Sequence, residues 1–395
     1  MNKKNLQKGS KSILVLTELF LPTKGGTAVW FDKVYRLLGG KAIHIVTANV
    51  SGADAHDKYH ENTIHRIDLS RFAWLKPESL VMYLKLLWAS IRLGLKYRFQ
   101  IVHAGRVLPE GLVGFFAARV FKIPLVIYAH GEEITTWRQP VKLSVMKYVY
   151  RQADGVIANS EFTKQELLKI GVTESRIINL SPGVDVQHFK PGLVTEDLKK
   201  KIGVGDNNKL LLSVGRLSRR KGFDHTIKAL SCLRKKGLDV HYAIVGIGKD
   251  KPYLEQLAQD NGVVKQVHFL GHVSEEDLPR WYNAADLFVM PNREINGDTE
   301  GFGMVFLEAN ACGKPVIAGI AGGTGGAVLD GKTGFRIDGT RVDELTDHIC
   351  KLLTDQTLAR ELGQNGLNRV QNSFSWQSIA AKTAKINCAI VKDRK

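Results

Sequence analysis

The sequence predicts an α/β protein built from two doubly wound parallel sheets, one in each of two domains. Its 395 residues are more than one hydrophobic core usually serves. Short apolar runs of strand length alternate with longer segments of helical character. This alternation loosens after Ser181-Pro-Gly-Val-Asp185, through Lys190-Pro-Gly and a polar stretch, and then restarts. A domain boundary is therefore expected near residues 185–208.

Six apolar runs in the first half are predicted to be strands, and their near-continuous apolar character indicates a sheet covered on both faces. They are Ile13–Leu16, Ile43–Thr47, Ile101–His103, Pro124–Tyr128, Val156–Ala158 and Ile177–Leu180. The helices predicted between them include Val29–Leu38, Leu112–Phe121 and Lys164–Ile170.

Five further runs in the second half repeat the arrangement, each followed by helical sequence. They are Leu210–Val214, Val240–Val245, Val267–Phe269, Leu287–Met290 and Pro315–Ala318. Ligands of doubly wound sheets bind outside the carboxyl ends of the strands. Functional residues are therefore expected directly after each run.

The formal net charge of +17 is unevenly distributed along the chain. Residues 1–190 hold 27 Lys and Arg against 15 Asp and Glu, whereas residues 191–395 hold 29 against 24. A basic first half indicates an anionic partner, such as a phosphorylated substrate, a phospholipid surface or a nucleic acid. A solubilising surface explains any single basic cluster equally well.

Targeting signals and cysteine usage both favour the cytoplasm. The first 12 residues are polar and basic, and Lys85 and Arg92 interrupt the longest apolar stretch, Leu80–Tyr97. We therefore expect neither a secretory signal nor a transmembrane helix. Four cysteines without CxxC spacing argue against a zinc module or a disulfide framework.

Two segments that follow predicted strands are suited to phosphate. Gly25-Gly26-Thr27 leads into a helix, where backbone N–H groups can approach an anion, although such a turn is as often purely structural. Arg216 and Lys221 lie in the loop after Leu210–Val214 and could neutralise a diphosphate. The alternative is a solvated basic loop, and this interpretation suits Arg219 and Arg220 better.

A third strand ends at Val245-Gly246-Ile-Gly248. The third glycine of a dinucleotide-binding fingerprint is missing, so the turn is weak support for NAD binding. Its backbone could still face a nucleotide.

The most informative segment is Glu300-Gly-Phe-Gly-Met-Val-Phe-Leu-Glu308, which follows the run Leu287–Met290. Glycines at 301 and 303 suit a loop whose N–H groups contact a ligand. Glu300 is expected at the start of a helix and Glu308 two turns along the same face. Two such carboxylates could accept hydrogen bonds from the hydroxyls of a sugar and a ribose. A carboxylate that only stabilises a helix N-terminus is the alternative.

On these residues the chain resembles glycosyltransferase family 4, retaining enzymes of the GT-B fold. The resemblance extends from Gly25-Gly26 to the final helix, and its most specific part is the pair Glu300 and Glu308. Arg216 and Lys221 match the family's donor-phosphate pair, and His130 matches its histidine after an N-domain strand. The long loop from Pro291 to Glu300 is similar to that of mannosyltransferases acting on phosphatidylinositol lipids.

The resemblance implies an N-terminal Rossmann-like acceptor-binding domain of residues 1–187, joined by a C-terminal helix at about 374–395 that packs back on it. It implies a nucleotide-sugar domain of residues 188–373. The family's frequent glutamate in the segment Gly322–Val328 falls on Gly326 here, which leaves no acidic contact at that position.

The resemblance also implies a role for each site residue. Catalytic roles fall to His130, Arg216, Lys221 and Glu300, with the cations stabilising the leaving diphosphate. Glu308 would hold the ribose hydroxyls. The remaining donor-binding positions are Gly25, Gly26, Thr27, Gly246, Gly301, Phe302 and Gly303. The family implies front-face displacement without a carboxylate nucleophile, and neither a cofactor nor a divalent metal is expected.

The expected activity is therefore transfer of a hexose from a nucleotide sugar to a glycan or lipid-linked acceptor at the cytoplasmic membrane face. GDP-mannose and UDP-hexoses fit the residues equally well, and the loop 291–300 favours mannose. Residues Arg71–Lys76 lead into Leu80–Arg98, where Lys85, Arg92 and Lys96 share one helical face. This segment is either a membrane-surface element or an ordinary amphipathic helix packed on the sheet.

Two other functions remain open on the sequence. An NAD-dependent epimerase or dehydrogenase is motivated by the Gly246 turn, but lacks the third glycine. A basic nucleic-acid-binding protein is motivated by the net charge, but no helix-turn-helix, zinc motif or RNA-binding aromatic pattern is present.

Overall fold

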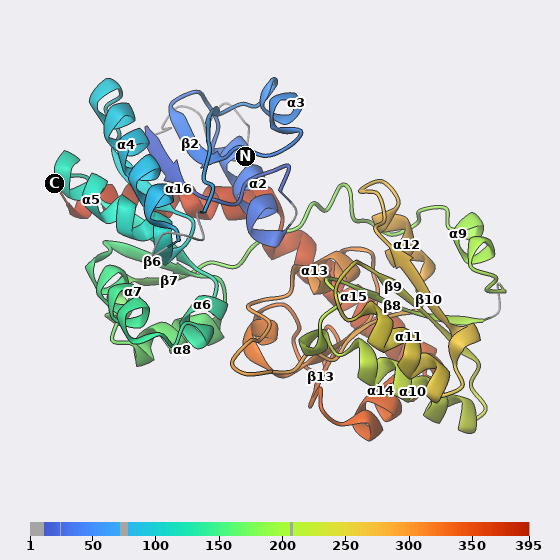
Figure 1. Ribbon diagram of the computed structural model, residues 1–395. Coiled ribbons are helices and arrows are strands. Elements are labelled where there is room, and N and C mark those ends of the chain that lie inside the picture. The colour runs from blue at the N-terminus through green and yellow to red at the C-terminus, as the bar shows by residue number, and fades with distance from the viewer. Residues whose placement is uncertain (1–11, 24, 72–77, 206–207, 395) are drawn as a thin grey trace. The chain divides into compact units, whose positions relative to one another are not determined.

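The computed structural model describes residues 12–23, 25–71, 78–205 and 208–394 (Figure 1). The chain divides into two compact units. Unit 1 comprises Met1–Pro182 and Trp376–Lys395, and unit 2 comprises Gly183–Ser375. Each unit is a parallel sheet with helices on both faces, so the predicted fold class is confirmed. The boundaries expected at 187/188 and 373/374 differ from these by five residues and by two residues.

Unit 1 contains a seven-stranded sheet of order β3-β2-β1-β4-β5-β6-β7, and every strand pair is parallel. The order reverses between β1 and β4, which is where such sheets bind ligands. The strands are β1 Ile13–Leu16, β2 Ile43–Ala48, β3 Thr63–Ile67, β4 Ile101–Ala104, β5 Leu125–Ala129, β6 Gly155–Ala158 and β7 Ile177–Asn179.

The helices of unit 1 connect these strands, except that the last helix comes from the end of the chain. That helix, α16, packs against α2. The helices are α2 Gly26–Leu38, α3 Ala53–Asp57, α4 Leu80–Lys96, the π-helical turn η1 Val107–Gly111, α5 Leu112–Phe121, α6 Glu132–Thr136, α7 Pro140–Gln152, α8 Glu161–Lys169, η2 Glu174–Arg176 and α16 Trp376–Asp393.

Unit 2 repeats the design with a six-stranded parallel sheet of order β10-β9-β8-β11-β12-β13. Its strands are β8 Lys209–Val214, β9 Val240–Val245, β10 Val267–Gly271, β11 Leu287–Met290, β12 Val316–Gly319 and β13 Phe335–Ile337. Its helices are α9 Glu196–Lys201, η3 Arg219–Lys221, α10 Phe223–Lys235, α11 Lys251–Asp260, η4 Val264–Gln266, α12 Leu278–Ala284, α13 Met304–Ala311, η5 Gly322–Gly326, α14 Val342–Thr354 and α15 Gln356–Ser373.

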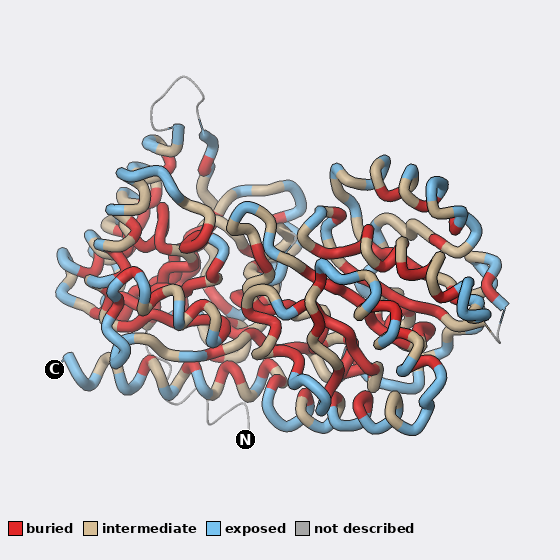
Figure 2. The backbone as a smooth tube through the Cα atoms, turned by 90° about the horizontal axis from the view of Figure 1, so that it is seen from below, coloured by how far each residue is buried: buried red, intermediate tan, exposed pale blue. Residues whose placement is uncertain are grey.

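The inner strands are the most apolar and the most deeply buried parts of both sheets (Figure 2). Every residue of β1, β4, β5 and β6 is buried, as expected for strands covered on both faces. The sequence missed β3 and β13, which are edge strands with partly exposed, mixed sequences. The edge strands β7 and β10 were predicted from their apolar runs, whereas the mixed sequences of β3 and β13 carry too weak an apolar signal to be found by composition.

None of the helices in the described ranges combines the length and apolar character that a bilayer crossing requires. The N-terminal residues 1–11, on which the expectation of no secretory signal rested, lie outside the described residues. Residues 72–77, within the expected membrane-surface element, also lie outside them.

Candidate active site

The predicted site residues fall into two sets, one at the carboxyl ends of each sheet. Arg216 follows β8, Gly246 follows β9, and Glu300 lies in the loop after β11. In unit 1, the segment Gly25–Thr27 starts α2 and His130 follows β5. Parallel strands deliver the loops after them to the same edge of a sheet, which is why residues distant in sequence gather there.

Glu300 is the centre of a buried ion-pair network in unit 2. One of its carboxylate oxygens accepts hydrogen bonds from the ammonium group of Lys221 and from Nη1 of Arg220, the latter at 2.9 Å. The side chains of Lys221 and Glu300 are only 11% and 12% exposed. Burial by itself raises the pKa of the Glu300 carboxyl, but Lys221 and Arg220 outweigh burial and hold the pKa below its usual value. Glu300 is therefore ionised at neutral pH.

Arg220 belongs to this network, so its assignment to a solvated loop was wrong. Besides Glu300, its guanidinium contacts Asp298 at 3.0 Å. The 3-10 turn η3 turns successive side chains in different directions, and this turn brings Arg220 and Lys221 inward. Arg219 points elsewhere, with its guanidinium 3.1 Å from the ring centre of Tyr253.

Arg216 is exposed, and no ion pair joins it to another described residue. Its five N–H donors are thus available to an incoming anion. Lys221 keeps two further N–H donors while it contacts Glu300, because an ammonium group has three. Arg220 and Lys221 pair with the two carboxylates Asp298 and Glu300, so the charge of Arg216 is not neutralised by this network.

Glu300 does not start a helix, contrary to expectation. The helix α13 begins at Met304, and Glu300 lies in the preceding loop, where its carbonyl accepts the N–H of Gly323 at 2.7 Å. The helix is delayed by Gly303, whose φ of 88° is left-handed. A Cβ atom at Gly303 would stand 2.5 Å from the Phe306 ring, so only glycine fits.

Glu308, on α13, is oriented by Tyr282 on α12. The phenol of Tyr282 is completely buried and donates to Oε2 of Glu308 at 2.7 Å. Burial raises the pKa of the Glu308 carboxyl to about 7, although the hydrogen bond from Tyr282 lowers it. Glu300 and Glu308 therefore differ in charge near neutral pH. Sequence reasoning missed Tyr282, which only the packing of α12 on α13 brings to this carboxylate.

Gly246 is required by the packing of two loops. Its φ is 142°, and a Cβ atom there would lie 1.9 Å from the carbonyl oxygen of Gly215. The backbone N–H of Gly215 donates to Val245, and that of Gly246 donates to Gly271, so the loops after β8, β9 and β10 extend the sheet. Close packing of protein on protein thus explains this glycine without a dinucleotide.

The departure from the family at Gly326 has a steric counterpart in Phe302. The buried ring of Phe302 would stand 2.9 Å from a Cβ atom at Gly326. The carbonyl of Gly326 accepts a hydrogen bond of 2.7 Å from Arg369. A side chain at position 326 would therefore displace Phe302.

Gly25 and Gly26 form an open turn in unit 1. Both are exposed, and nothing lies within 4 Å of the place where a Cβ atom of Gly25 would stand. The carbonyl of Gly25 accepts the first α-helical bond, from Val29, so Gly26 and Thr27 occupy the first turn of α2. N–H groups in a first turn have no partner within their own helix and suit an anion.

His130 is held in one orientation by its neighbours. Its Nε2 lies 2.8 Å from the carbonyl of Gly105, and its backbone N–H donates to Glu133. A carbonyl can only accept, so Nε2 carries the proton and Nδ1 of the neutral ring keeps a lone pair. Burial lowers the pKa of His130. The ring is therefore neutral at pH 7 and can accept a hydrogen bond from a hydroxyl at Nδ1.

Glu110 is a second buried carboxyl of unit 1 that the sequence did not reveal. It lies in η1, where Oε1 accepts the N–H of Glu18 at 2.8 Å and Oε2 has no partner among the described residues. Burial raises its pKa to about 7. Glu18 follows β1 and Glu110 follows β4, so the pair marks the reversal point of the sheet.

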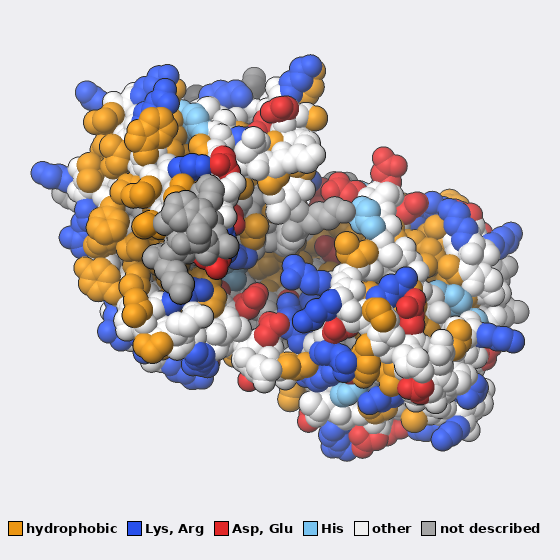
Figure 3. Space-filling model, viewed as in Figure 1, with side chains coloured by type: hydrophobic (Ala, Val, Ile, Leu, Met, Phe, Trp, Pro, Cys, Tyr) orange, Lys and Arg blue, Asp and Glu red, His pale blue; other side chains and the backbone are white. Residues whose placement is uncertain are grey.

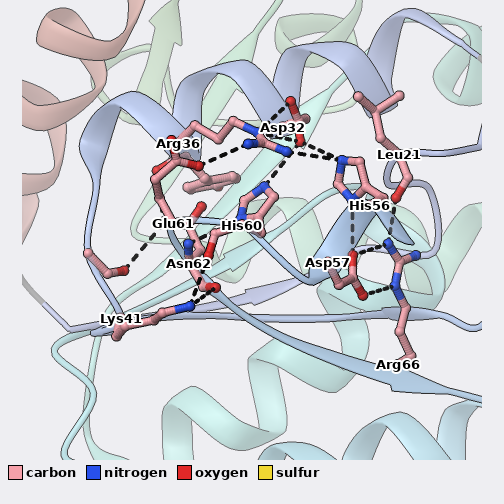
Figure 4. Close-up of polar contacts among 12 residues, drawn as sticks. Leu21, Asp32, Arg36, Lys41, His56, Asp57, His60, Glu61, Asn62 and Arg66 are labelled. Atoms are coloured by element: carbon pink, nitrogen blue, oxygen red, sulfur yellow. Dashed lines mark hydrogen bonds and ion pairs between the residues drawn. The ribbon is translucent and has the colours of Figure 1, made fainter. Parts of the chain in front are cut away.

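One group of three side chains in the described residues has the composition of a metal site: Asp32, His56 and His60 (Figure 4). Nδ1 of His60 accepts the N–H of Asn62, so the neutral ring holds its proton on Nε2 and donates to Asp32 at 3.1 Å. Arg36 contacts both oxygens of the Asp32 carboxylate at 3.0 Å. His60 holds a proton on the nitrogen that faces the cluster, and the Asp32 carboxylate is already bound by Arg36. The three residues therefore fit a hydrogen-bond network that joins α2 to α3 better than they fit a metal centre.

Two family models together match most of the chain. The model described as Glycosyltransferase Family 4 matches residues 25–188, within which lie Gly25–Thr27 and His130. The model described as Glycosyl transferases group 1 matches residues 194–369, within which lie Arg216, Lys221, Glu300 and Glu308.

Curated relatives are similar over nearly their whole length. A GDP-mannose-dependent alpha-(1-6)-phosphatidylinositol monomannoside mannosyltransferase of Mycolicibacterium smegmatis is 31% identical over 95% of this chain and 97% of the relative. A GDP-mannose-dependent monoacylated alpha-(1-6)-phosphatidylinositol monomannoside mannosyltransferase of Corynebacterium glutamicum is 28% identical over 95% and 98%.

Solved structures share the fold at lower identity. Anabaena HepE in complex with UDP and glucose superposes with a TM-score of 0.81 at 22% identity, covering 96% of this chain and all of that one. Sucrose-phosphate synthase of Thermosynechococcus elongatus gives 0.81 at 23% identity, covering 96% and 99%. The two Rossmann-like units therefore form a GT-B fold.

These matches identify an enzyme that uses a nucleotide-sugar donor, and they lend no support to the NAD-dependent or the nucleic-acid-binding alternative. The chain belongs to glycosyltransferase family 4.

Proposed function

We propose that this enzyme transfers mannose from GDP-mannose to a phosphatidylinositol-type lipid acceptor at the cytoplasmic face of a membrane. The observation that carries the proposal is the 31% identity, across 95% of the chain, to a mannosyltransferase with that donor and that class of acceptor. The basic character of residues 1–190 supports an anionic acceptor.

The donor would be held mainly by unit 2. The ionised Glu300 and the backbone around Gly301–Gly303 would bind hydroxyls of the mannose, and Glu308 would accept from those of the ribose. Arg216 and Lys221 would contact the diphosphate, where negative charge develops as it leaves. Arg220 would support Lys221 by sharing the charge of Glu300.

In unit 1, the first turn of α2 at Gly25–Thr27 offers N–H groups suited to phosphate oxygens. The lone pair on Nδ1 of His130 would accept a hydrogen bond from a mannose hydroxyl. Neither role needs a change of protonation, because His130 is neutral at pH 7.

We further propose that the anomeric configuration is retained and that no metal or cofactor takes part. The bond between the anomeric carbon and the β-phosphate oxygen breaks, and the acceptor oxygen bonds to the same face of that carbon. The acceptor proton moves to the departing phosphate oxygen. Lys221 and Arg216 would supply the charge stabilisation that a divalent ion supplies in other transferases.

Transfer assays with labelled donors test the proposal directly. Purified enzyme is incubated with GDP-mannose or UDP-glucose, with phosphatidylinositol and its mannosides as acceptors, with and without EDTA. We expect labelled lipid with GDP-mannose as donor and none with UDP-glucose. The product should have an α linkage by NMR, and EDTA should not lower the transfer rate. Transfer from UDP-glucose alone would disprove the donor assignment, a β linkage would disprove retention, and a requirement for metal would disprove metal independence.

A further inference from the structure

The outer surface of three helices in unit 1 carries most of that unit's exposed large apolar side chains. Helices α4, α5 and α7 contribute Leu84, Trp88, Leu95, Phe116, Val120 and Tyr148, each at least half exposed. We call this surface the α4–α5–α7 face. In Figure 3 hydrophobic side chains gather over these helices, on the left of the view.

The apolar residues on the face are not misplaced core residues. In α4, Met82, Leu86 and Leu93 form a buried stripe that packs on the sheet. Leu84, Trp88 and Leu95 are spaced four and seven residues apart and form a separate, exposed stripe. A surface helix that packs on the core through one apolar stripe usually carries polar residues on its opposite side. A second apolar stripe on that side indicates contact with another apolar environment.

The three helices form one continuous surface. At Gly94 of α4 a Cβ atom would stand 2.1 Å from the Phe121 ring of α5, so these helices touch. The rings of Phe115 and Tyr148 lie 5.7 Å apart and join α5 to α7. The exposed side chains therefore lie on one patch rather than on three isolated helices.

The three helices that carry this apolar surface contribute positive charge and no negative charge. The segments Leu80–Lys96, Leu112–Phe121 and Pro140–Gln152 contain no Asp or Glu at all. Their basic residues are Lys85, Arg92, Lys96, Arg119, Lys142, Lys147 and Arg151. One of these, Lys85, is paired with Asp68 at 2.6 Å.

Two of these cations lie over aromatic rings of α4 and α5. The guanidinium of Arg92 stands 5.2 Å from the ring centre of Trp88, and that of Arg119 stands 5.0 Å from Phe115. Apolar side chains edged by cations with long stems are typical of proteins that lie on a membrane surface.

Unit 2 provides an internal comparison. Its large apolar residues that are at least half exposed are Val194, Ile247, Val264 and Ile320, and they lie on separate segments. Single exposed apolar residues are ordinary on soluble proteins, whereas a continuous patch marks an interaction surface.

We infer that the α4–α5–α7 face docks on an anionic phospholipid bilayer, with its apolar side chains among the upper acyl chains and its cations against headgroup phosphates. The inference deepens the proposed function, since a lipid acceptor gives the docking its purpose. A second copy of the face is a poor occupant, because it would set two surfaces against each other whose helices carry only basic charges.

Vesicle flotation without donor or acceptor tests the inference. Vesicles of phosphatidylcholine alone are compared with vesicles that also contain phosphatidylglycerol. We expect the wild-type protein to float with the second kind and to be released by salt. Trp88→Glu combined with Val120→Glu should lower the partition coefficient by about tenfold or more, as should Arg92→Glu combined with Lys147→Glu.

Val264→Glu is the matched control, because Val264 is 54% exposed on unit 2 and Val120 is 62% exposed on the face. The control should float like the wild type, and all variants should keep the circular-dichroism spectrum and the melting temperature of the wild type, which shows that they are folded.

The inference fails if the wild type floats with neither kind of vesicle, or if the face variants float as well as the control. It also fails if sedimentation shows a dimer that the same substitutions dissociate. Because the vesicles hold no acceptor, absence of mannosyl transfer would refute the proposed function without affecting flotation. Conversely, lost flotation with intact transfer to a detergent-dispersed acceptor would refute only the docking face.

Discussion

Among the described residues, each unit holds one carboxyl group whose pKa burial raises to about 7, Glu110 in unit 1 and Glu308 in unit 2. Glu308 has a dedicated side-chain donor, the phenol of Tyr282, whereas one oxygen of Glu110 accepts a backbone N–H and the other has no partner in the described part of the chain. Unit 2 also holds the ionised Glu300 between two cations.

The two sheets are more alike at their outer edges. In unit 1, Nδ1 of His44 and Nε2 of His65 lie 2.9 Å apart, with the rings stacked across β2 and β3. In unit 2, His241 and His268 lie 3.0 Å apart across the corresponding strands β9 and β10. The scaffold is thus repeated even in its polar details, while the loops after the strands have diverged. Differences between the units are therefore informative about function, and similarities about architecture.

The largest expected effect on kcat distinguishes Lys221 from Arg219, two residues of η3 in unit 2. Lys221→Ala should lower kcat by about 100- to 1,000-fold, because it removes a cation from the leaving diphosphate. The control, Arg219→Ala, should change kcat by less than about threefold, since Arg219 packs on Tyr253 instead. Steady-state kinetics with GDP-mannose measure both. Equal losses in the two variants would show that the loop acts only through its overall charge.

A smaller effect is expected where a phenol supports Glu308. Tyr282→Phe should raise KM for GDP-mannose by about tenfold with little change in kcat, because the carboxylate loses its orientation. The KM of the wild type should rise as the pH falls through about 7, since a protonated Glu308 accepts fewer hydrogen bonds from the ribose hydroxyls. Glu308→Gln should remove that pH dependence. A pH-dependent KM in Glu308→Gln would assign the titration to another group.

Glu110, the buried carboxyl of unit 1 that corresponds to Glu308, should affect the free energy of unfolding instead of donor binding. The folded-state pKa of Glu110 is raised, so its contribution to stability is complete below about pH 4.5 and is lost as the pH rises through about 7. Glu110→Gln should therefore gain roughly 3 kcal/mol relative to the wild type between pH 4.5 and 8. Urea unfolding at several pH values measures the difference. A variant that instead loses donor affinity would place Glu110 in the active site.

The smallest expected effect concerns the pH dependence of stability, and it should be the same for His44 in unit 1 and His268 in unit 2. Burial lowers the pKa of His44 and of His268 to about 4, so unfolding takes up protons and stability falls as the pH drops from 6.5 towards 4. His44→Phe and His268→Phe should each flatten this decline by less than about 1 kcal/mol. Thermal melts at pH 7 and pH 5 suffice. Opposite responses of the two variants would show that the edges are not equivalent.

The architecture followed from the sequence because buried parallel strands leave a strong apolar signal. All eleven predicted strands exist, whereas the partly exposed edge strands β3 and β13 were missed. Side-chain partnerships were harder to predict. Nothing in the spacing of Arg219, Arg220 and Lys221 indicates which of them turn inward, because the 3-10 turn η3 decides it.

The position of Glu300 shows a second limit. Glu308 follows Glu300 by eight positions, which suggests one helical face, but the left-handed Gly303 delays the helix until Met304. Tyr282 and Glu110 gave no signal at all, because their partners come from packing across more than 20 residues of sequence. The roles of the site residues remain predictions that the experiments above address.

The helix α16 has a consequence for how the chain is made. Unit 1 begins with the first strand, yet it contains a helix from the last 20 residues, whose Trp376, Ile379 and Ala380 are buried. A ribosome therefore releases the whole of unit 2, a contiguous segment, before it releases the helix that completes unit 1. During synthesis α2 therefore lacks its packing partner until α16 has been released. A stop codon shortly before Trp376 would leave unit 2 intact and unit 1 permanently unfinished.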